Sequence, residues 1–192
     1  RAQRQNFKME LAYLDDFISE LRTLSHADSK LTFLKDELGA ILLARQTVLV
    51  FTLYTDTMDY IREMLKSQYR SGLGCYSGRG GERWNPDEQA WELVTKEEIK
   101  RAFRAGEIKV LIGTDSMSEG LNLQTSGRLI NYDMPWNFMR VEQRIGRVDR
   151  IGGKAKVEIT NYFYAGTVEE QIYRGIVDDF KWFEDAVGPA QP

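Results

Sequence analysis

The segment EQRIGRVDRIGG, residues 142–153, is the stretch around which the rest of the chain is organised. On a helical wheel of about 100° per residue, Val141, Ile145 and Val148 share one face. The adjoining arc carries Arg140, Gln143, Arg144, Arg147 and Arg150. A helix here is expected to dock through its apolar face and to present guanidinium groups. Because planar arginine forks suit polyphosphates, this repetition favours a bound anion over the alternative, a solvated basic face.

The composition limits the class of protein. A chain of 192 residues with 42% hydrophobic content can bury one sizeable core. The formal net charge of -3 argues against coating nucleic acid through bulk charge, so any such contact must come from a local basic strip. One cysteine, Cys75, excludes an internal disulfide, and one histidine, His26, leaves no His/Cys metal cluster.

The ends and the hydropathy of the chain bear on its location. No apolar run approaches membrane-spanning length and no signal peptide opens the sequence, so we expect an intracellular protein with no membrane contact. The first residue is not methionine and the last residues, VGPAQP, are typical of a linker. We therefore expect a piece of a longer protein.

Short apolar runs alternate with helical patterns along the chain. Strands are expected at 47–52, 73–76, 108–114, 128–133 and 157–164, and helices precede, separate and follow them. Asp28 or Ser29, one of residues 55–59, Thr95 with Glu98, and Thr167 with Glu170 are the expected helix caps. This order predicts an α/β fold with a doubly wound, mainly parallel sheet and helices on both faces.

The connection between Gly78 and Val94 is long for a compact domain and carries Trp84 and Trp91. Its length indicates a functional insertion or a partner surface, and core packing of the tryptophans is an equal alternative. The preceding glycines do not form a phosphate-binding loop, because no Lys-Ser or Lys-Thr pair follows them.

The polar segment DSMSEGLNLQ, residues 115–124, directly follows the strand expected at 108–114. Ligands of open parallel sheets bind beyond the carboxyl ends of the strands. This segment supplies hydroxyls, carboxylates, a glycine and amides there, and the arginine-rich helix is expected to reach the same edge.

Four stretches in order carry a family resemblance. They are DSKLTFL with TVLVFT (28–34, 47–52), YSG (76–78), LIGTDSMSEGLNLQ (111–124) and LINYDMPWNFMRVEQRIGRVDRIGG (129–153). Together they resemble the second RecA-like lobe of superfamily 2 helicase-type motors, specifically the Swi/Snf-type double-stranded DNA translocases and their bacterial RNA-polymerase-associated members. The resemblance covers most of residues 28–183. It implies a RecA-like fold of the P-loop NTPase type.

The resemblance also implies roles for individual residues. Arg147 and Arg150 match candidate arginine fingers, and Gln143 matches a position that faces ATP. The loop that couples nucleotide to DNA corresponds to Glu119, Gly120 and Asn122, and the DNA backbone contacts correspond to Thr52, Thr55, Thr114 and Ser116. The family departs from this chain at Asp149, where its eukaryotic members have histidine, and at CYSG (75–78), where they have an RLDG-like element.

These matches define the expected role. Residues 1–27 are expected to form a linking helix, 28–186 the helicase C-terminal RecA-like domain and 187–192 a tail. ATP with Mg²⁺ is the implied cofactor, with Mg²⁺ held by a first lobe whose phosphate loop and acidic box this sequence lacks, and no metal site of its own is expected. The implied partners are double-stranded DNA and that N-terminal lobe, in the bacterial cytoplasm at the nucleoid. The fragment alone is expected to hydrolyse ATP negligibly. A non-catalytic module gripping RNA polymerase or another protein, and an RNA helicase lobe, remain alternatives.

Overall fold

The computed structural model describes residues 2–23, 28–44, 46–118, 123, 127–146 and 157–187. The chain divides into two compact units, residues 1–33 and 34–192. The first unit contains helix α1 (Ala2–Thr23), which lies within residues 1–27, where a helix is expected. It also contains the beginning of α2 (Ser29–Leu43), where the Leu31 amide donates to Asp28 Oδ1 at 3.0 Å, as the expected cap requires.

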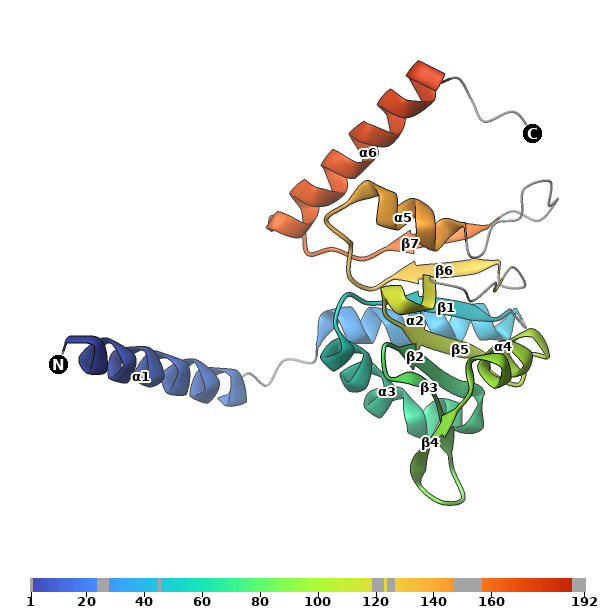
Figure 1. Ribbon diagram of the computed structural model, residues 1–192, viewed down its shortest axis with the longest axis horizontal. Coiled ribbons are helices and arrows are strands. Elements are labelled where there is room, and N and C mark those ends of the chain that lie inside the picture. Colours follow the sequence, from blue (N-terminus) through green and yellow to red (C-terminus); the bar gives the residue numbers. More distant parts are fainter. Residues whose placement is uncertain are drawn as a thin grey trace. The chain divides into compact units, whose positions relative to one another are not determined.

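The described strands of the second unit form one seven-stranded sheet in the order β4-β3-β2-β5-β1-β6-β7 (Figure 1). Five of them, β2, β5, β1, β6 and β7, run parallel, whereas β3 and β4 are antiparallel to their neighbours. Their bounds are β1 (Val48–Phe51), β2 (Leu73–Ser77), β3 (Gly80–Asn85), β4 (Ala90–Val94), β5 (Val110–Gly113), β6 (Arg128–Asn131) and β7 (Glu158–Asn161). The central strands β1 and β5 are buried at every position, as their continuous apolar sequences predict.

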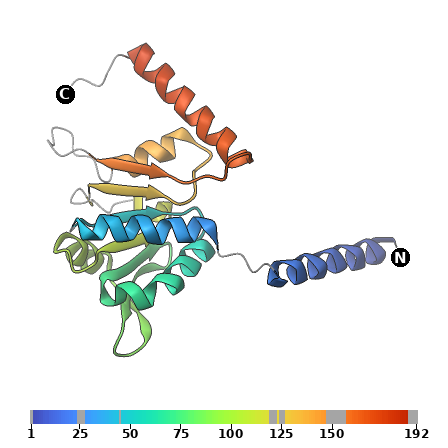
Figure 2. The ribbon, with the colours of Figure 1, turned by 180° about the vertical axis from the view of Figure 1, so that it is seen from behind.

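Helices cover both faces of this sheet, which confirms the predicted RecA-like layering (Figures 1 and 2). Helices α2 and α3 (Thr55–Tyr69) lie on one face, and α4 (Lys96–Arg104) and α5 (Phe138–Ile145) lie on the other. On the α4 face, Ile99 and Phe103 pack against Leu49, Phe51 and Leu111. The last helix, α6 (Val168–Val187), packs on α5 through a small cluster that contains Met134, Val141 and Ile176.

The expected helix caps are confirmed in part. Thr95 and Glu98 form the predicted capping box of α4, and Gly106 follows that helix with a φ of +71°. The cap expected within residues 55–59 is wrong, because α3 begins after Tyr54, which makes no side-chain cap. At α6, the Glu170 carboxylate accepts from the Gly166 amide at 2.7 Å and the Thr167 hydroxyl donates to the Tyr164 carbonyl, so the predicted reciprocal pair is replaced by these contacts.

The connection that follows Gly78 is a β-hairpin of β3 and β4. Trp84 lies opposite Trp91 across the ladder, with ring centroids 5.4 Å apart. Helix α3 holds both rings, since the Arg62 guanidinium lies 4.5 Å from the Trp91 ring and the Lys66 ammonium 4.7 Å from the Trp84 ring. Trp84 is buried, so the packing interpretation of this tryptophan is confirmed.

Candidate functional site

The carboxyl ends of the parallel strands bring distant polar residues to one edge of the sheet. Phe51, Gly113 and Asn131 are in register at the ends of β1, β5 and β6. The next residues along the chain, Thr52 and Thr114 among them, therefore lie side by side at that edge. This is where an open parallel sheet binds ligands.

Thr52 is fully buried at this edge and has a partner. Its hydroxyl donates to Asp133 Oδ2 at 2.5 Å, and the Leu53 amide donates to the same oxygen at 3.3 Å. The hydroxyl is thus not presented to a phosphate in this structure, and the DNA contact expected at Thr52 stays a prediction. Thr55, in the first turn of α3, is half-buried.

Thr114 and Ser116 lie together directly after β5. Their hydroxyl oxygens are 3.4 Å apart, and the Thr114 amide donates to the Tyr76 carbonyl at 3.2 Å. A Cβ added at Gly78 would lie 3.8 Å from Ser116 Oγ, so the YSG stretch reaches the same place. Thr114 is buried and Ser116 half-buried, which leaves Ser116 the more accessible of the two predicted hydroxyls.

Arg144 differs from the exposed arginine expected on the helix arc, because its side chain is completely buried. Its Nε donates to Asp115 Oδ1 at 2.8 Å, and its Nη2 lies 2.7 Å from the same oxygen. Its Nη1 donates to Asn131 Oδ1 at 2.7 Å and to the Asp133 carbonyl at 3.1 Å. The guanidinium also lies 5.0 Å from the centre of the Phe51 ring. The expectation of a solvent-facing cation at position 144 is therefore wrong.

The electrostatics of this contact follow from its burial. Loss of water lowers the pKa of the Arg144 guanidinium, and the adjacent Asp115 carboxylate opposes that shift. Arginine remains charged despite such opposing effects, so an ion pair between a buried guanidinium and a partly exposed carboxylate joins α5 to the segment after β5, η2 (Asp115–Ser118).

Two other residues expected on the exposed arc of α5, Arg140 and Gln143, are described by the structure. Arg140 is exposed and its Nη1 donates to Asp115 Oδ2 at 2.8 Å, so it reaches the same carboxylate as Arg144 from outside. Gln143 is exposed, as its expected ligand-facing position requires, and its role stays a prediction. The remaining expected site residues, Arg147, Arg150, Glu119, Gly120 and Asn122, lie outside the described residues.

A hollow of about 390 Å³ lies beside this edge. It is lined by Leu53, Tyr54, Pro135, Trp136, Asn137 and Arg140. Tyr54 and Trp136 are 63% and 71% exposed, which is unusual for large aromatic side chains on loops next to a core. Sequence reasoning did not place either residue in the site. The available signal was their position, since each lies within a few residues of the end of a buried strand.

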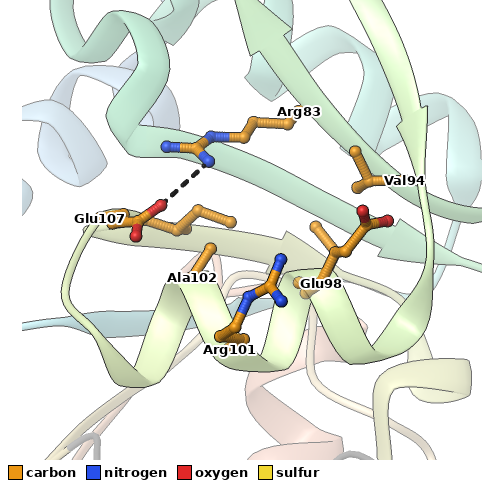
Figure 3. Close-up of a pocket in the computed structure, with 8 residues that line it drawn as sticks. Arg83, Val94, Glu98, Arg101, Ala102 and Glu107 are labelled. Carbon is orange, nitrogen blue, oxygen red and sulfur yellow. Dashed lines mark hydrogen bonds and ion pairs between the residues drawn. The ribbon is translucent and has the colours of Figure 1, made fainter.

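A smaller pocket, of about 150 Å³, lies at the opposite end of the strands (Figure 3). Glu107 and Ile108 line it just before β5 begins, and Arg83 Nη1 donates to Glu107 Oε2 at 3.2 Å across it. Because this is the amino edge of the parallel strands, the pocket does not belong to the site.

The described ranges bear on metal binding and on membrane insertion. In these ranges, no three His, Cys, Asp or Glu side chains are grouped so that they could hold a metal ion. None of the helices in the same ranges combines the length and apolarity that crossing a membrane requires.

Comparisons with known proteins bear on the family to which the chain belongs. Residues 29–152 match the model of the helicase conserved C-terminal domain. The uncharacterized ATP-dependent helicase YqhH of Bacillus subtilis (strain 168) is 39% identical over 141 residues, which cover 73% of this chain and 23% of YqhH. The RNA polymerase-associated protein RapA of Vibrio vulnificus (strain YJ016) is 38% identical over 86 residues, or 45% of this chain and 8% of RapA.

A solved structure shares the fold. The crystal structure of the C-terminal part of the Fun30 ATPase domain has a TM-score of 0.62 and 23% identity, and the match covers 86% of this chain and 53% of that one. Most of each curated relative has no counterpart in these 192 residues. The match over more than half of the chain, the parallel sheet with helices on both faces and the helicase relatives agree: the chain belongs to the helicase conserved C-terminal domain family and has the fold of the C-terminal RecA-like lobe of superfamily 2 helicases.

Proposed function

We propose that this chain is the C-terminal motor lobe of an ATP-dependent double-stranded DNA translocase. The observation that carries the proposal is the Arg144–Asp115 pair, which joins the helix expected to face nucleotide to the segment expected to face DNA. In this role residues 28–186 are the motor domain, and an N-terminal lobe of the same protein provides the phosphate loop and the Mg²⁺ ligands.

The nucleotide side is built on α5. The Asn137 side chain caps this helix by accepting from the Met139 amide at 2.8 Å, and Arg144 fixes the other end to the sheet. Gln143 is exposed on the helix so anchored. Arg147 and Arg150 follow in sequence as the proposed arginine fingers, which would neutralise charge on the oxygens of the transferring phosphoryl group.

The DNA side is built on the strand ends. Ser116 and Thr114 offer hydroxyls for the sugar-phosphate backbone, and the exposed rings of Tyr54 and Trp136 line the hollow beside the same edge. Contacts of this kind position a protein on a duplex without reading its sequence. That is the behaviour a translocase needs.

Arginine substitutions in the intact protein test the proposal. Arg147→Ala and Arg150→Ala should each lower DNA-stimulated ATP turnover on the order of 10³-fold, the scale of an arginine finger, and leave duplex DNA binding within a few-fold of wild type. Arg174→Ala, which removes an exposed ion pair with Glu170 on α6, is the matched control. Unchanged turnover in both finger variants would rule out the motor role.

The choice of polymer needs a separate measurement. ATP turnover of the intact protein should rise with duplex DNA more than with single-stranded DNA or RNA at equal nucleotide concentration. Stimulation by RNA alone would favour the RNA helicase alternative. The 192 residues by themselves should hydrolyse ATP negligibly, because the proposed fingers act on a nucleotide held by the other lobe.

One observation favours a second candidate, a module that grips RNA polymerase. RapA, a relative, is described as RNA polymerase-associated, and β4 exposes Leu93 to 77% on a hairpin at the edge of the sheet. A scaffold of this kind needs neither Arg147 nor Arg150, so the same two variants separate the candidates. Either role belongs in the bacterial cytoplasm, at the nucleoid.

A further inference from the structure

We propose that Arg144 is a positioning residue that locks the nucleotide-facing helix α5 to the DNA-facing segment η2, so that the two respond to their ligands as one body. The inference rests on the proposed function and deepens it. It assigns a role to a side chain that is buried away from both proposed ligands.

The contacts of Arg144 reach the ends of three parallel strands. Asp115 follows β5, Asn131 ends β6, and Phe51, whose ring faces the guanidinium, ends β1. The network extends one step further, because Asn131 Nδ2 donates to Asn161 Oδ1 at 2.8 Å at the end of β7. Arg144 therefore connects α5 to the ends of β5, β6 and β1 directly, and to the end of β7 through Asn131.

The chemistry of this position calls for a guanidinium. Two nitrogens of one planar group serve three acceptors: Nε donates to Asp115, and Nη1 donates to Asn131 and to the Asp133 carbonyl. Nη2 lies within ion-pair distance of the same Asp115 oxygen. A lysine ammonium is a point donor on a flexible chain and cannot fix all of them in one plane. Lysine at position 144 would keep the charge and lose the geometry.

Stability alone does not explain the contact. A buried ion pair is often no more stabilising than apolar side chains of similar volume, because both charges lose their water. A fixed arrangement of groups is what such a pair can add. Here the pair fixes α5 relative to η2. Helix α5 carries Gln143 on its exposed side, and η2 carries Ser116.

A second arginine provides an internal comparison. Arg140 binds the same Asp115 carboxylate, but its side chain is 58% exposed and its guanidinium donates to that carboxylate from the solvent side. Loss of Arg140 would leave the connections of Arg144 to β6 and β1 in place. Loss of Arg144 would leave Arg140 as the link between α5 and Asp115, and it would remove the links of α5 to Asn131 and to the Phe51 ring.

The test uses the intact protein and the variant Arg144→Lys, with Arg174→Gln as the control for removal of an exposed arginine pair. ATP turnover is measured with and without saturating duplex DNA, together with KM for ATP, the DNA concentration for half-maximal stimulation, and Tm. Turnover is compared at a temperature well below both Tm values. We expect kcat with DNA to fall on the order of 10-fold to 100-fold, since misplacement by about 1 Å can be worth 100-fold, while KM and the DNA midpoint change little.

A role limited to the fold gives a different result. Arg144→Lys would then lower Tm but leave kcat and the DNA stimulation of the folded protein at wild-type values, and that outcome overturns the proposal. Should Arg144→Lys fail to fold, Asp115→Asn tests the same link from a surface segment whose side chain is 24% exposed. Wild-type stimulation in Asp115→Asn likewise overturns it. Failure of the proposed function is recognised separately, because wild-type protein would then show no stimulation by DNA.

Discussion

The hydroxyl of Thr52 donates to Asp133 Oδ2 at 2.5 Å and so joins the end of β1 to the residues after β6, 81 positions later in the chain. The bond is buried on the Thr52 side, and Asp133 also accepts from the Leu53 amide. It defines the shape of the carboxyl edge between two neighbouring strands.

Removal of this hydroxyl should destabilise the fold. Thr52→Val keeps the shape of the side chain and loses the donor, and we expect a loss of about 1–2 kcal/mol in the free energy of unfolding because a half-buried carboxylate loses a partner. Thr52→Ser keeps the hydroxyl and is the matched control. Urea denaturation of the purified chain measures both. Equal stability of the two variants would show that the hydrogen bond contributes nothing.

Alkaline pH should weaken the contact between α2 and the edge strand β7. Burial raises the pKa of Tyr162, and the hydrogen bond that its hydroxyl donates to Glu37 Oε2 raises it further. Because the folded pKa lies above the unfolded value of about 10, this contribution is complete below that pH and is lost as pH rises beyond it. Denaturation measured between pH 8 and 11 should therefore show that the free energy of unfolding declines at the alkaline end of this range. The decline should be smaller in Tyr162→Phe.

The control for this pH dependence is Tyr164→Phe. Tyr164 is 45% exposed on the same segment. A decline of equal size in wild type and Tyr162→Phe would mean that other groups cause it.

The single thiol should be unreactive in the folded chain. Cys75 is buried in β2 and burial raises its pKa to about 12. At pH 8 only about one thiol in 10⁴ would be ionised, and the thiolate is the reactive form. A chromogenic disulfide reagent should therefore label the native chain far more slowly than the chain in denaturant. Rapid stoichiometric labelling of native protein would contradict the buried placement.

Two glycines should respond oppositely to alanine. A Cβ at Gly113 would lie 2.5 Å from the Tyr76 carbonyl oxygen and 3.0 Å from Met117 Sδ, so Gly113→Ala should destabilise the sheet by about 1–3 kcal/mol. A Cβ at Gly39, inside α2, meets nothing within 4 Å. Gly39→Ala should stabilise by about 0.5–1 kcal/mol because glycine is a poor helix former. Thermal unfolding should give a lower Tm for Gly113→Ala and a higher Tm for Gly39→Ala than for the wild-type chain.

The parallel part of the fold could be predicted because its sequence carries the information locally. Val48–Phe51 and Val110–Gly113 are apolar runs short enough for strands, and the buried stripe Met58, Ile61 and Leu65 of α3 follows the helical period. The hairpin of β3 and β4 was not predicted, because the information that specifies it is not local in the sequence. Its strands carry Glu82 and Arg83 beside Trp84, and the partners that accommodate such residues, such as Arg62 for Glu82, are distant in sequence.

The candidate site shows the same limit. The helical wheel placed Arg144 correctly beside its neighbours on the helix, but it could not show that Asp115, 29 positions earlier, would cover the guanidinium. The turn sequence Asn85-Pro86-Asp87 between the two tryptophans was a usable hairpin signal. No comparable local pattern in the sequence predicts an ion pair such as Arg144–Asp115.

The antiparallel direction of β3 has a practical consequence. Its first residues adjoin the edge that carries Ser116, and its last residues lead to the turn at Pro86 and Gln89 on the far rim. A fluorophore or a surface tether attached to that turn would sit a full strand length from the groups proposed to handle nucleotide and duplex. Single-molecule experiments on the intact protein could therefore use this turn as the attachment point, because a label there would block neither proposed ligand.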